Sequence, residues 1–355
     1  MQKIGFYSGS FNPFTRGHME VVAKGLQQMD RVIIGVGINP TKTVHSANTD
    51  AIIGSIKNCV EACAFNDIIR DTPSKACTEF AQKYSKNPEI VQVVPYTGTT
   101  VDAAHHMGCQ YLIRGLRAGG TDDAYEQNLD AMNQLLCDTK RYNLQTVLIP
   151  TDGKHAHLSS SNARALAACG EFEALKSICY PSAVEYMAAD YLRSKKLQPM
   201  PSVGYHNNTH VACMINWLNA AGAENMDFAA SVHDAGPLQT VVKQYPDVAN
   251  LILATDHTGE CEQKCAWDRN ACLFHDADLS ILFSRNYGWY AYQVFCEYKD
   301  KYSVSEYAQG RIKVLEKLLT TDYKTDYFKR FQGDALRNIN WEISYWQDRL
   351  KGHSH

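Results

Sequence analysis

The feature that most constrains this chain is its run from Gly9 to His18, Gly-Ser-Phe-Asn-Pro-Phe-Thr-Arg-Gly-His. The apolar residues just before it, Ile4 to Tyr7, are typical of a buried strand, and Met19–Gln28 after it has the pattern of a helix. Glycine lets the backbone approach an anion, and a helix start offers free N–H groups at the positive end of its dipole. The run therefore predicts a strand–loop–helix junction that handles phosphate.

The rest of the first 150 or so residues alternates short apolar runs with helical stretches. We predict strands at 31–37, 90–95, 111–113 and 146–149, and helices at 51–64, 101–107 and 122–138. This alternation is typical of an α/β fold, a parallel sheet with helices on both faces. Ligands bind such sheets beyond the carboxyl ends of the strands, where the strand order reverses. The Gly9–His18 loop lies at such an end.

A change of composition divides the chain near residue 200. Residues 193–203 are basic and contain two prolines, which is typical of a linker. Beyond them helical patterns dominate, above all at 306–319 and 333–350, and Tyr and Trp cluster. With 355 residues in the chain, we predict two domains, 1–192 and 204–355.

Composition excludes several classes of protein. A formal net charge of -3 argues against a general nucleic-acid binder. The chain has no apolar run of about eighteen residues and no signal peptide pattern, so we expect no membrane span and a cytoplasmic location. The twelve cysteines are scattered and form no four-ligand zinc spacing, so we expect reduced thiols.

Four stretches, in this order, resemble phosphopantetheine adenylyltransferases over about residues 1–190. The Gly9–His18 run carries the (T/H)xGH signature of the nucleotidyltransferase superfamily, and Lys42 follows the second predicted strand. Arg114-Gly-Leu-Arg117 follows a later strand, and Ser159-Ser-Ser-Asn-Ala-Arg164 opens a helix. The resemblance implies a Rossmann-like nucleotidyltransferase domain that moves the adenylyl group of ATP to 4'-phosphopantetheine, giving dephospho-coenzyme A and pyrophosphate.

In such an enzyme positioning and charge stabilisation do most of the catalysis, because an acceptor phosphate attacks the α-phosphorus in line. The resemblance implies that His18 and Lys42 stabilise the charge that develops. It implies an acceptor site of Ser10, Lys42, Thr100 and Arg114, and Mg²⁺ bound with ATP. The implied ATP site consists of Gly9, Ser10, His18, Arg117, Glu126, Ser159, Ser160 and Ser161.

Some positions depart from the family pattern. Ser10 replaces the commoner threonine, and Asn12 replaces aspartate. Residues 67–89 form a longer segment, and 154–158 replace a more apolar, aromatic run. Because the last two touch regions that receive the acceptor, another phosphorylated acceptor such as nicotinamide mononucleotide stays open.

A second ordered set resembles the HD-superfamily metal-dependent phosphohydrolases over about residues 200–345. It consists of Tyr205-His-Asn-Asn-Thr-His210, the doublet His233-Asp234, and the run from Phe274 to Leu279. The resemblance implies an all-α HD domain with His210, His233, Asp234 and Asp278 as metal ligands.

Imidazole with carboxylate suits Mg, Mn, Fe or Zn, and such an ion activates water and polarises a phosphoryl oxygen. His206, four residues before His210 and on the same helical face, is the candidate general acid. His257 and His275 are candidates for a second metal. The alternative is a non-catalytic HD domain that senses a ligand or metal. We expect a bifunctional enzyme whose partners are ATP and a small phosphorylated acceptor, assembled as a homo-oligomer.

Overall fold

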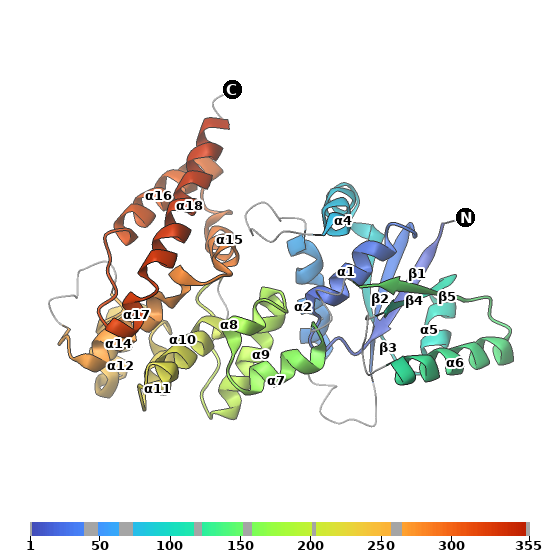
Figure 1. Cartoon of the computed structure of the whole chain (residues 1–355), viewed down its shortest axis with the longest axis horizontal. Coiled ribbons are helices and arrows are strands. Elements are labelled where there is room, and N and C mark those ends of the chain that lie inside the picture. Colours follow the sequence, from blue (N-terminus) through green and yellow to red (C-terminus); the bar gives the residue numbers. More distant parts are fainter. Residues whose placement is uncertain are drawn as a thin grey trace. The chain divides into compact units, whose positions relative to one another are not determined.

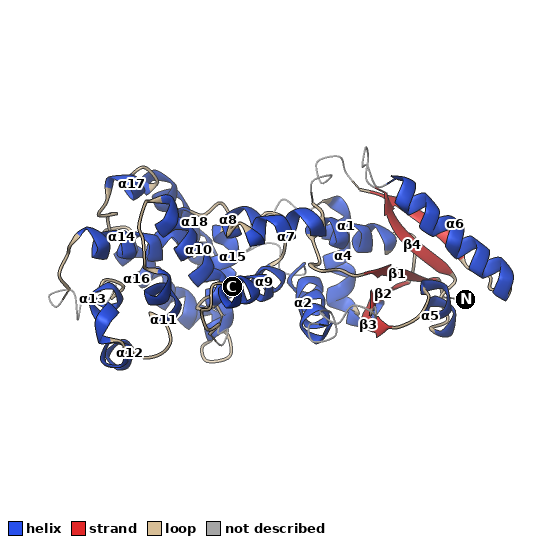
Figure 2. Ribbon diagram, turned by 90° about the horizontal axis from the view of Figure 1, so that it is seen from below, coloured by secondary structure: helices blue, strands red, loops and turns tan. Residues whose placement is uncertain are grey.

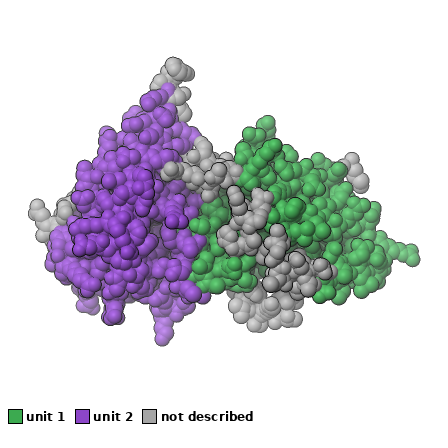
Figure 3. Space-filling view, viewed as in Figure 1, with its two compact units in different colours: residues 1–67, 71–166, 175–186 green, residues 68–70, 167–174, 187–355 purple. Residues whose placement is uncertain are grey.

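The computed structural model describes residues 2–38, 49–63, 74–116, 123–151, 158–200, 204–256 and 265–352, and only the backbone of residues 123–127, 129 and 352. The chain divides into two compact units (Figure 3). The first contains the described residues up to 166 and residues 175–186, and the second contains residues 167–174 and those described from 187 onward. The predicted linker, 193–203, begins at the end of a helix that runs from Pro181 to Ser194, and it stays a prediction.

A five-stranded parallel sheet forms the centre of the first unit (Figures 1 and 2). The strands lie in the order β3-β2-β1-β4-β5, with the bounds Ile4–Gly9 (β1), Arg31–Gly37 (β2), Val91–Tyr96 (β3), Tyr111–Leu116 (β4) and Gln145–Pro150 (β5). The run Val32-Ile33-Ile34 is buried on both sides, as expected of a parallel strand under two helical layers. The predicted Rossmann-like parallel sheet is confirmed.

Helices cover both faces of the sheet (Figure 2). Their bounds are Arg16–Gly25 (α1), Thr49–Ala62 (α2), Lys75–Lys86 (α4), Thr100–His106 (α5) and Asp123–Lys140 (α6). On one face Phe6 and Leu112 pack with Val101 of α5 and Cys137 of α6. On the other face α1 contacts β4 and β5, α2 contacts β3, and α4 packs on α1. The long segment before β3 therefore adds a helix to the layer that already contains α1.

Three helices follow the sheet: Ser160–Ala168 (α7), Phe172–Leu175 (α8) and Pro181–Ser194 (α9). Within the first unit, the segment before α9 pairs with the start of α1. Cys179 forms an isolated antiparallel bridge with Thr15, and the N–H of Arg16 donates to the carbonyl of Ile178 over 2.9 Å. A segment more than 150 residues further along the chain thus holds the Gly9–His18 loop in place.

The second unit is helical throughout its described residues. Its helices are Asn208–Ala220 (α10), Asp227–Val232 (α11), Leu238–Gln244 (α12), Ala249–Leu253 (α13), Arg269–Asp278 (α14), Tyr287–Tyr298 (α15), Val304–Leu318 (α16), Asp326–Lys329 (α17) and Gln332–Gly352 (α18), with 3₁₀ helices at Pro246–Val248 and Leu279–Phe283. Large aromatic residues such as Phe274, Phe328 and Trp346 fill the core. The helix-rich composition predicted after residue 200 is confirmed for these residues.

A buried ion pair joins α16 to α18 in this core. The guanidinium of Arg311 donates to both oxygens of Glu342, over 2.8 and 3.0 Å, and the Glu342 side chain is 0% exposed. Tyr287 and Trp346 donate to the same carboxylate, over 2.6 and 3.1 Å. Four hydrogen bonds therefore satisfy a carboxylate that no water reaches, as buried charge requires.

The described residues contain neither a disulfide nor a membrane-spanning helix. The cysteines among them are free thiols. None of the described helices has the length and apolar composition needed to cross a lipid bilayer.

Candidate functional site

The first candidate site lies at the carboxyl edge of the sheet, where β1 and β4 are neighbours. The chain proceeds from β1 to β2 on one side and returns to β4 on the other, so the strand order reverses here. Gly9 ends β1, the exposed Ser10 follows it, and Arg114 lies near the end of β4. Open α/β sheets bind ligands at such reversals. The fold therefore brings Gly9, Ser10 and Arg114 to the edge where a ligand is expected.

Hydrogen bonds at the start of α1 fix the orientation of His18. The Thr15 hydroxyl accepts the N–H of His18 over 3.4 Å, and Nδ1 of His18 accepts the N–H of Thr15 over 2.9 Å. Because Nδ1 accepts, the neutral ring carries its proton on Nε2. The rings of Phe11 and Phe14 lie with centroids 5.2 and 5.4 Å from that of His18. The capping box thus leaves His18 with an N–H donor at a helix start, where anions are favoured.

Three side chains hold the Gly9–His18 loop from the α7 and α9 helices. The Ser160 hydroxyl donates to the carbonyl of Pro13 over 3.0 Å, and Arg164 donates to the carbonyl of Asn12 over 2.6 Å. The Tyr186 hydroxyl donates to the side-chain oxygen of Asn12 over 2.8 Å. The asparagine that stands where the family has aspartate therefore has a partner in the fold.

The other two serines also have local partners. Ser159 caps α7, its hydroxyl oxygen accepting the N–H of Asn162 over 3.0 Å. The Ser161 hydroxyl oxygen accepts a hydrogen bond from Arg164 over 3.1 Å. Both hydroxyls keep a proton to donate, whereas that of Ser160 is used within the fold. The assignment of all three to ATP stays a prediction.

The remaining predicted residues of this site are only partly described. Thr100 is the first residue of α5, and its hydroxyl lies 3.0 Å from the Tyr96 hydroxyl at the end of β3. Lys42 and Arg117 lie outside the described residues. Glu126 belongs to α6, but its side chain is not described.

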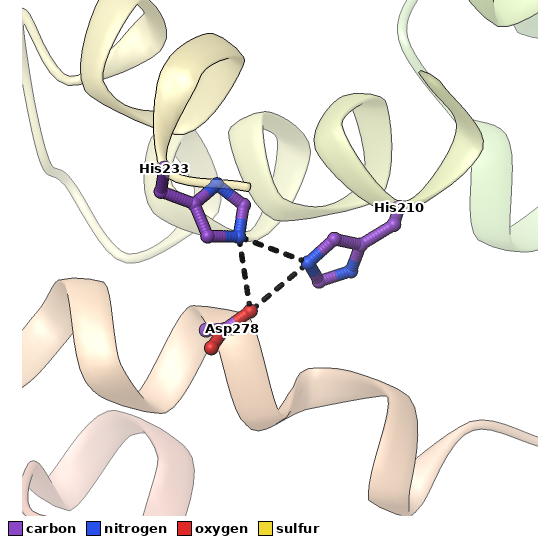
Figure 4. Close-up of side chains that lie close together, drawn as sticks. All are labelled: His210, His233 and Asp278. Carbon is purple, nitrogen blue, oxygen red and sulfur yellow. Dashed lines mark hydrogen bonds and ion pairs between the residues drawn. The ribbon is translucent and has the colours of Figure 1, made fainter. Parts of the chain in front are cut away.

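The second candidate site is a cluster of two imidazoles and two carboxylates, of which Figure 4 shows His210, His233 and Asp278. The Nε2 atoms of His210 and His233 are 3.2 Å apart, and Asp278 Oδ1 lies 2.9 and 3.4 Å from them. Asp234 Oδ2 is 3.0 Å from His233 Nε2 and 3.6 Å from His210 Nε2. Ligand atoms about 2.1 Å from one ion lie about 3.0–3.4 Å apart in octahedral or tetrahedral shells. The atoms of His210, His233 and Asp278 therefore fit around one divalent ion, and the Asp234 carboxylate lies next to the two imidazoles.

Three helices supply these side chains. His210 lies in the first turn of α10, which begins where the Asn207 side chain accepts the N–H of His210 over 3.1 Å. His233 directly follows α11, and Asp278 is the last residue of α14. Both imidazoles are buried, whereas the Asp234 side chain is 25% exposed. The exposed side of Asp234 leaves the cluster accessible to a small ligand.

The second nitrogen of each imidazole also has a partner. His233 Nδ1 lies 2.9 Å from the carbonyl of Ala230, which only accepts, so the ring carries its proton there and turns a lone pair toward the cluster. His210 Nδ1 lies 2.7 Å from the Tyr205 hydroxyl. Burial lowers the pKa of His233, but the cluster carboxylates raise it more, so its pKa lies well above the ordinary value. The cluster therefore favours a positive charge at its centre, as a bound divalent ion would supply.

Asp276 has a different role from Asp278. Its fully buried carboxylate accepts the N–H and the hydroxyl of Thr325, each over 2.7 Å. His275 Nδ1 lies 3.0 Å from the same carboxylate rather than in the cluster. The sequence-based preference for Asp278 agrees with this geometry. His257, the other candidate for a second metal, lies outside the described residues.

His206 lies before α10, which begins at Asn208, so the prediction that it shares a helical face with His210 is wrong; its partner is Glu297. His206 Nδ1 is 3.6 Å from Glu297 Oε1, and 52% of the His206 side chain is exposed. The hydrogen bond to Glu297 raises the pKa of His206, as do the charges of Asp234 and Asp278, against the opposing effect of burial. Gly204, with φ of +57°, lies directly against the Glu297 side chain, so a Cβ has no room there. This glycine lets α15 bring its carboxylate to His206.

The roles of Tyr205 and Glu297 were not predicted. Tyr205 stands at the head of the Tyr205–His210 run, and that position was the only available signal for its contact with His210. Glu297 lies 92 residues from the backbone N–H of Tyr205 that it accepts, a separation that no local pattern reports.

A pocket of about 660 Å³ opens beside the cluster. Four of the site residues line it, namely His206, His210, Asp234 and Asp278. Much of the remaining lining comes from the 3₁₀ helix Leu279–Phe283, from α15 and from α16. The pocket thus connects the candidate metal ligands with space for a larger molecule.

Residues 6–166 match the family model described as cytidylyltransferase-like. This span runs from β1 to α7 and contains the Gly9–His18 loop and the serine run.

Curated relatives of this part of the chain are phosphopantetheine adenylyltransferases. The enzyme of Porphyromonas gingivalis is 33% identical over 170 residues, 48% of this chain and 90% of the relative. That of Lachnoclostridium phytofermentans is 33% identical over 168 residues, 47% of this chain and 84% of the relative. A solved Plasmodium falciparum nicotinic acid mononucleotide adenylyltransferase, complexed with APC, is 16% identical with a TM-score of 0.27, over 56% of this chain and 97% of that chain. A score this low carries no information about the fold.

Proposed function

We propose that this protein adenylylates 4'-phosphopantetheine with ATP, giving dephospho-coenzyme A and pyrophosphate, because its N-terminal half belongs to the phosphopantetheine adenylyltransferase family. The observation that carries the proposal is the extent of the match, which spans 84–90% of these relatives at 33% identity. The orientation of His18 at the end of the β1 loop supports it.

In this reaction the acceptor phosphate attacks the α-phosphorus and pyrophosphate leaves in line, so the protein mainly positions charge. His18 donates from Nε2 to the α-phosphoryl oxygens, and Lys42 acts with it. Ser10, Thr100 and Arg114 hold the acceptor phosphate. Mg²⁺ bound with ATP shields the charge of the leaving pyrophosphate. The proposed ATP contacts are Gly9, Ser10, His18, Arg117, Glu126, Ser159, Ser160 and Ser161.

The test is an incubation of the purified full chain with ATP and Mg²⁺ and one acceptor at a time, read by mass spectrometry. We expect dephospho-coenzyme A from 4'-phosphopantetheine and little product from nicotinamide mononucleotide. A clear preference for nicotinamide mononucleotide would support adenylyl transfer but refute 4'-phosphopantetheine as the acceptor.

For the second unit we propose metal-dependent hydrolysis of a phosphoester, in the manner of an HD-superfamily phosphohydrolase. The observation that carries it is the convergence of His210 and His233 with Asp234 and Asp278, in which each carboxylate has an oxygen 2.9–3.6 Å from the two imidazole nitrogens. This set of donors suits Mn, Fe, Zn or Mg. Such an ion supplies a hydroxide at neutral pH and polarises a phosphoryl oxygen. His206, whose pKa Glu297 raises, gives a proton to the leaving oxygen.

The test has two measurements on one preparation of the full chain. We expect about one metal ion per chain by elemental analysis, and phosphate release from simple phosphomonoesters that stops when a chelator removes the metal. Metal at full occupancy without release from any phosphoester would instead identify a sensing domain. Absence of metal after reconstitution with each of the four ions would contradict both.

A further inference from the structure

The residues that line the pocket beside the candidate metal cluster are of two chemical kinds. The proposed metal ligands His210, Asp234 and Asp278, with His206, suit a phosphoryl group. Most of the other lining residues are aliphatic side chains and tyrosines, many of them from the 3₁₀ helix, α15 and α16. The aliphatic lining residues are Leu279, Ile281, Leu282, Val294, Val314 and Leu318.

The charged residues among the described lining of the pocket do not suit binding of a polyphosphate. Apart from histidine, Arg311 is the one basic residue among the described residues that line the pocket. Glu342 already accepts two hydrogen bonds from its guanidinium, which also lies 5.2 Å from the centroid of the Tyr290 ring. Glu297 and Glu306 add two carboxylates to the lining. Among the described lining residues, a second or third phosphate would therefore meet negative charge without an uncommitted cation to neutralise it.

The size of the pocket points to a substantial organic group. Pockets of roughly 300–1,000 Å³ hold ligands of drug size, and a phosphoryl group fills only a small part of about 660 Å³. Tyr205 and Tyr290 lie edge to face, 4.6 Å between centroids, and form a firm aromatic wall next to His210. A ligand that places its phosphate at the cluster must therefore extend along apolar surface.

We infer that the substrate of the second unit is a phosphate monoester of an uncharged alcohol with a long apolar group, and neither a nucleotide nor a polyphosphate. This inference rests on the proposed hydrolysis. The P–O bond to the alcohol breaks while an oxygen of water bonds to phosphorus. The leaving oxygen takes the proton of His206, and His206 recovers the proton that water gives up. The products are the free alcohol and inorganic phosphate.

The first experiment measures phosphate release by the metal-loaded full chain from methyl, butyl and octyl phosphate and from AMP and ATP. Each methylene buried against the wall contributes up to about fourfold in binding. We expect kcat/KM to rise at least about a hundredfold from methyl to octyl phosphate, and octyl phosphate to exceed both nucleotides. Equal rates along the alkyl series, or a preference for ATP, would overturn the inference while leaving hydrolysis established.

A variant series separates the wall from the catalytic groups. Val314, 50% exposed and on α16, lines the pocket, so Val314→Asp places a charge on the wall without disturbing the core. We expect it to lower kcat/KM for octyl phosphate at least tenfold and to leave methyl phosphate unchanged. Gln309→Asp, an exposed position on the same helix outside the lining, is the matched control and should change neither.

A binding measurement distinguishes failure of this inference from failure of the proposed function. Octylphosphonate and methylphosphonate are not hydrolysed, and calorimetry gives their affinities for the metal-loaded protein. We expect octylphosphonate to bind at least tenfold more tightly, and Val314→Asp to remove the difference. If no ester is hydrolysed but octylphosphonate still binds more tightly than methylphosphonate, the inferred apolar specificity is supported and the proposed hydrolysis is refuted. Equal affinities would refute the apolar specificity whether or not turnover occurs.

Discussion

The two candidate sites of this protein are assembled in different ways. In the first unit, the loop Gly9–His18 contributes Gly9, Ser10 and His18 to the candidate site, and His18 is oriented by Thr15, three residues before it. In the second unit, His210, His233 and Asp278 come from three helices and meet only when those helices pack. A site made by one turn depends on local hydrogen bonds, whereas a site made by packing depends on its whole core. The first site can therefore be predicted from the sequence more easily. The second is more sensitive to substitutions far from it.

The largest expected effect comes from removing the doublet in the second unit. His233→Ala with Asp234→Ala takes away two of four ligand atoms, so bound metal and phosphoester hydrolysis should both be lost. Metal content and both activities are measured on the same preparation. Adenylyl transfer should be unchanged, because its predicted residues lie before residue 164. Loss of transfer in the well-folded variant would show that the sites are coupled.

The effect of a substitution far from the second site is tested at the buried Arg311–Glu342 ion pair. Glu342→Ala leaves the buried guanidinium of Arg311 unpaired, which should lower the free energy of unfolding of this unit by about 3–5 kcal/mol. All five tryptophans lie in the second unit, so their fluorescence during urea unfolding follows this unit alone.

The matched control replaces both partners. Arg311→Met with Glu342→Leu removes the unpaired charge and should recover most of the lost stability. If Glu342→Ala alone were as stable as the parent, the core of the second unit would not depend on this ion pair.

The local site is tested by His18→Ala. Loss of the Nε2 donor should lower adenylyl transfer by at least about a hundredfold, as removal of a charge-stabilising donor does. The thermal stability of the fold and the hydrolytic activity should stay at their parent values. His106→Ala, an exposed histidine of the same unit, is the control and should have no effect. Near-normal adenylyl transfer by His18→Ala would contradict the assignment of the Gly9–His18 loop to the active site.

The smallest expected effect is a shift in pH dependence. Glu297 raises the pKa of His206, and a general acid works only while protonated, so hydrolysis should fall as pH rises through that pKa. Glu297→Gln lowers the pKa, although Asp234 and Asp278 still raise it, and the descending limb of the kcat profile should move to lower pH. Glu297→Asp should keep much of the parent profile. An unmoved limb would exclude His206 as the acid.

Much of the first unit was predictable because parallel strands buried on both faces leave continuous apolar runs. β2 has the predicted bounds, 31–37, and the other strands differ from prediction by at most a few residues. The position of the Gly9–His18 loop at the end of β1 followed from the run itself, and its handling of phosphate stays a prediction. The partner of Asn12, the hydroxyl of Tyr186, was not predictable because 174 residues separate them.

In the second unit the sequence predicted which polar residues converge but not what surrounds them. His210, His233 and Asp278, three of the four predicted ligands, lie together, and their role as metal ligands stays a prediction. The Tyr205 contact with His210, the apolar wall of the pocket and the Arg311–Glu342 pair arise from helix packing, which a single sequence does not report. The homo-oligomer, the cytoplasmic location and the identity of both metals stay predictions.

The Arg311–Glu342 pair also bears on the order in which a newly made chain becomes competent. Glu342 fixes Arg311, which faces the Tyr290 ring, and Tyr290 packs on Tyr205, the partner of His210. Glu342 lies in α18, which follows every other described helix, so this support is synthesised after all four candidate metal ligands. Domains generally fold as units in the order of synthesis. During translation the nucleotidyltransferase unit is therefore complete first, and the metal site acquires its full support only when α18 leaves the ribosome.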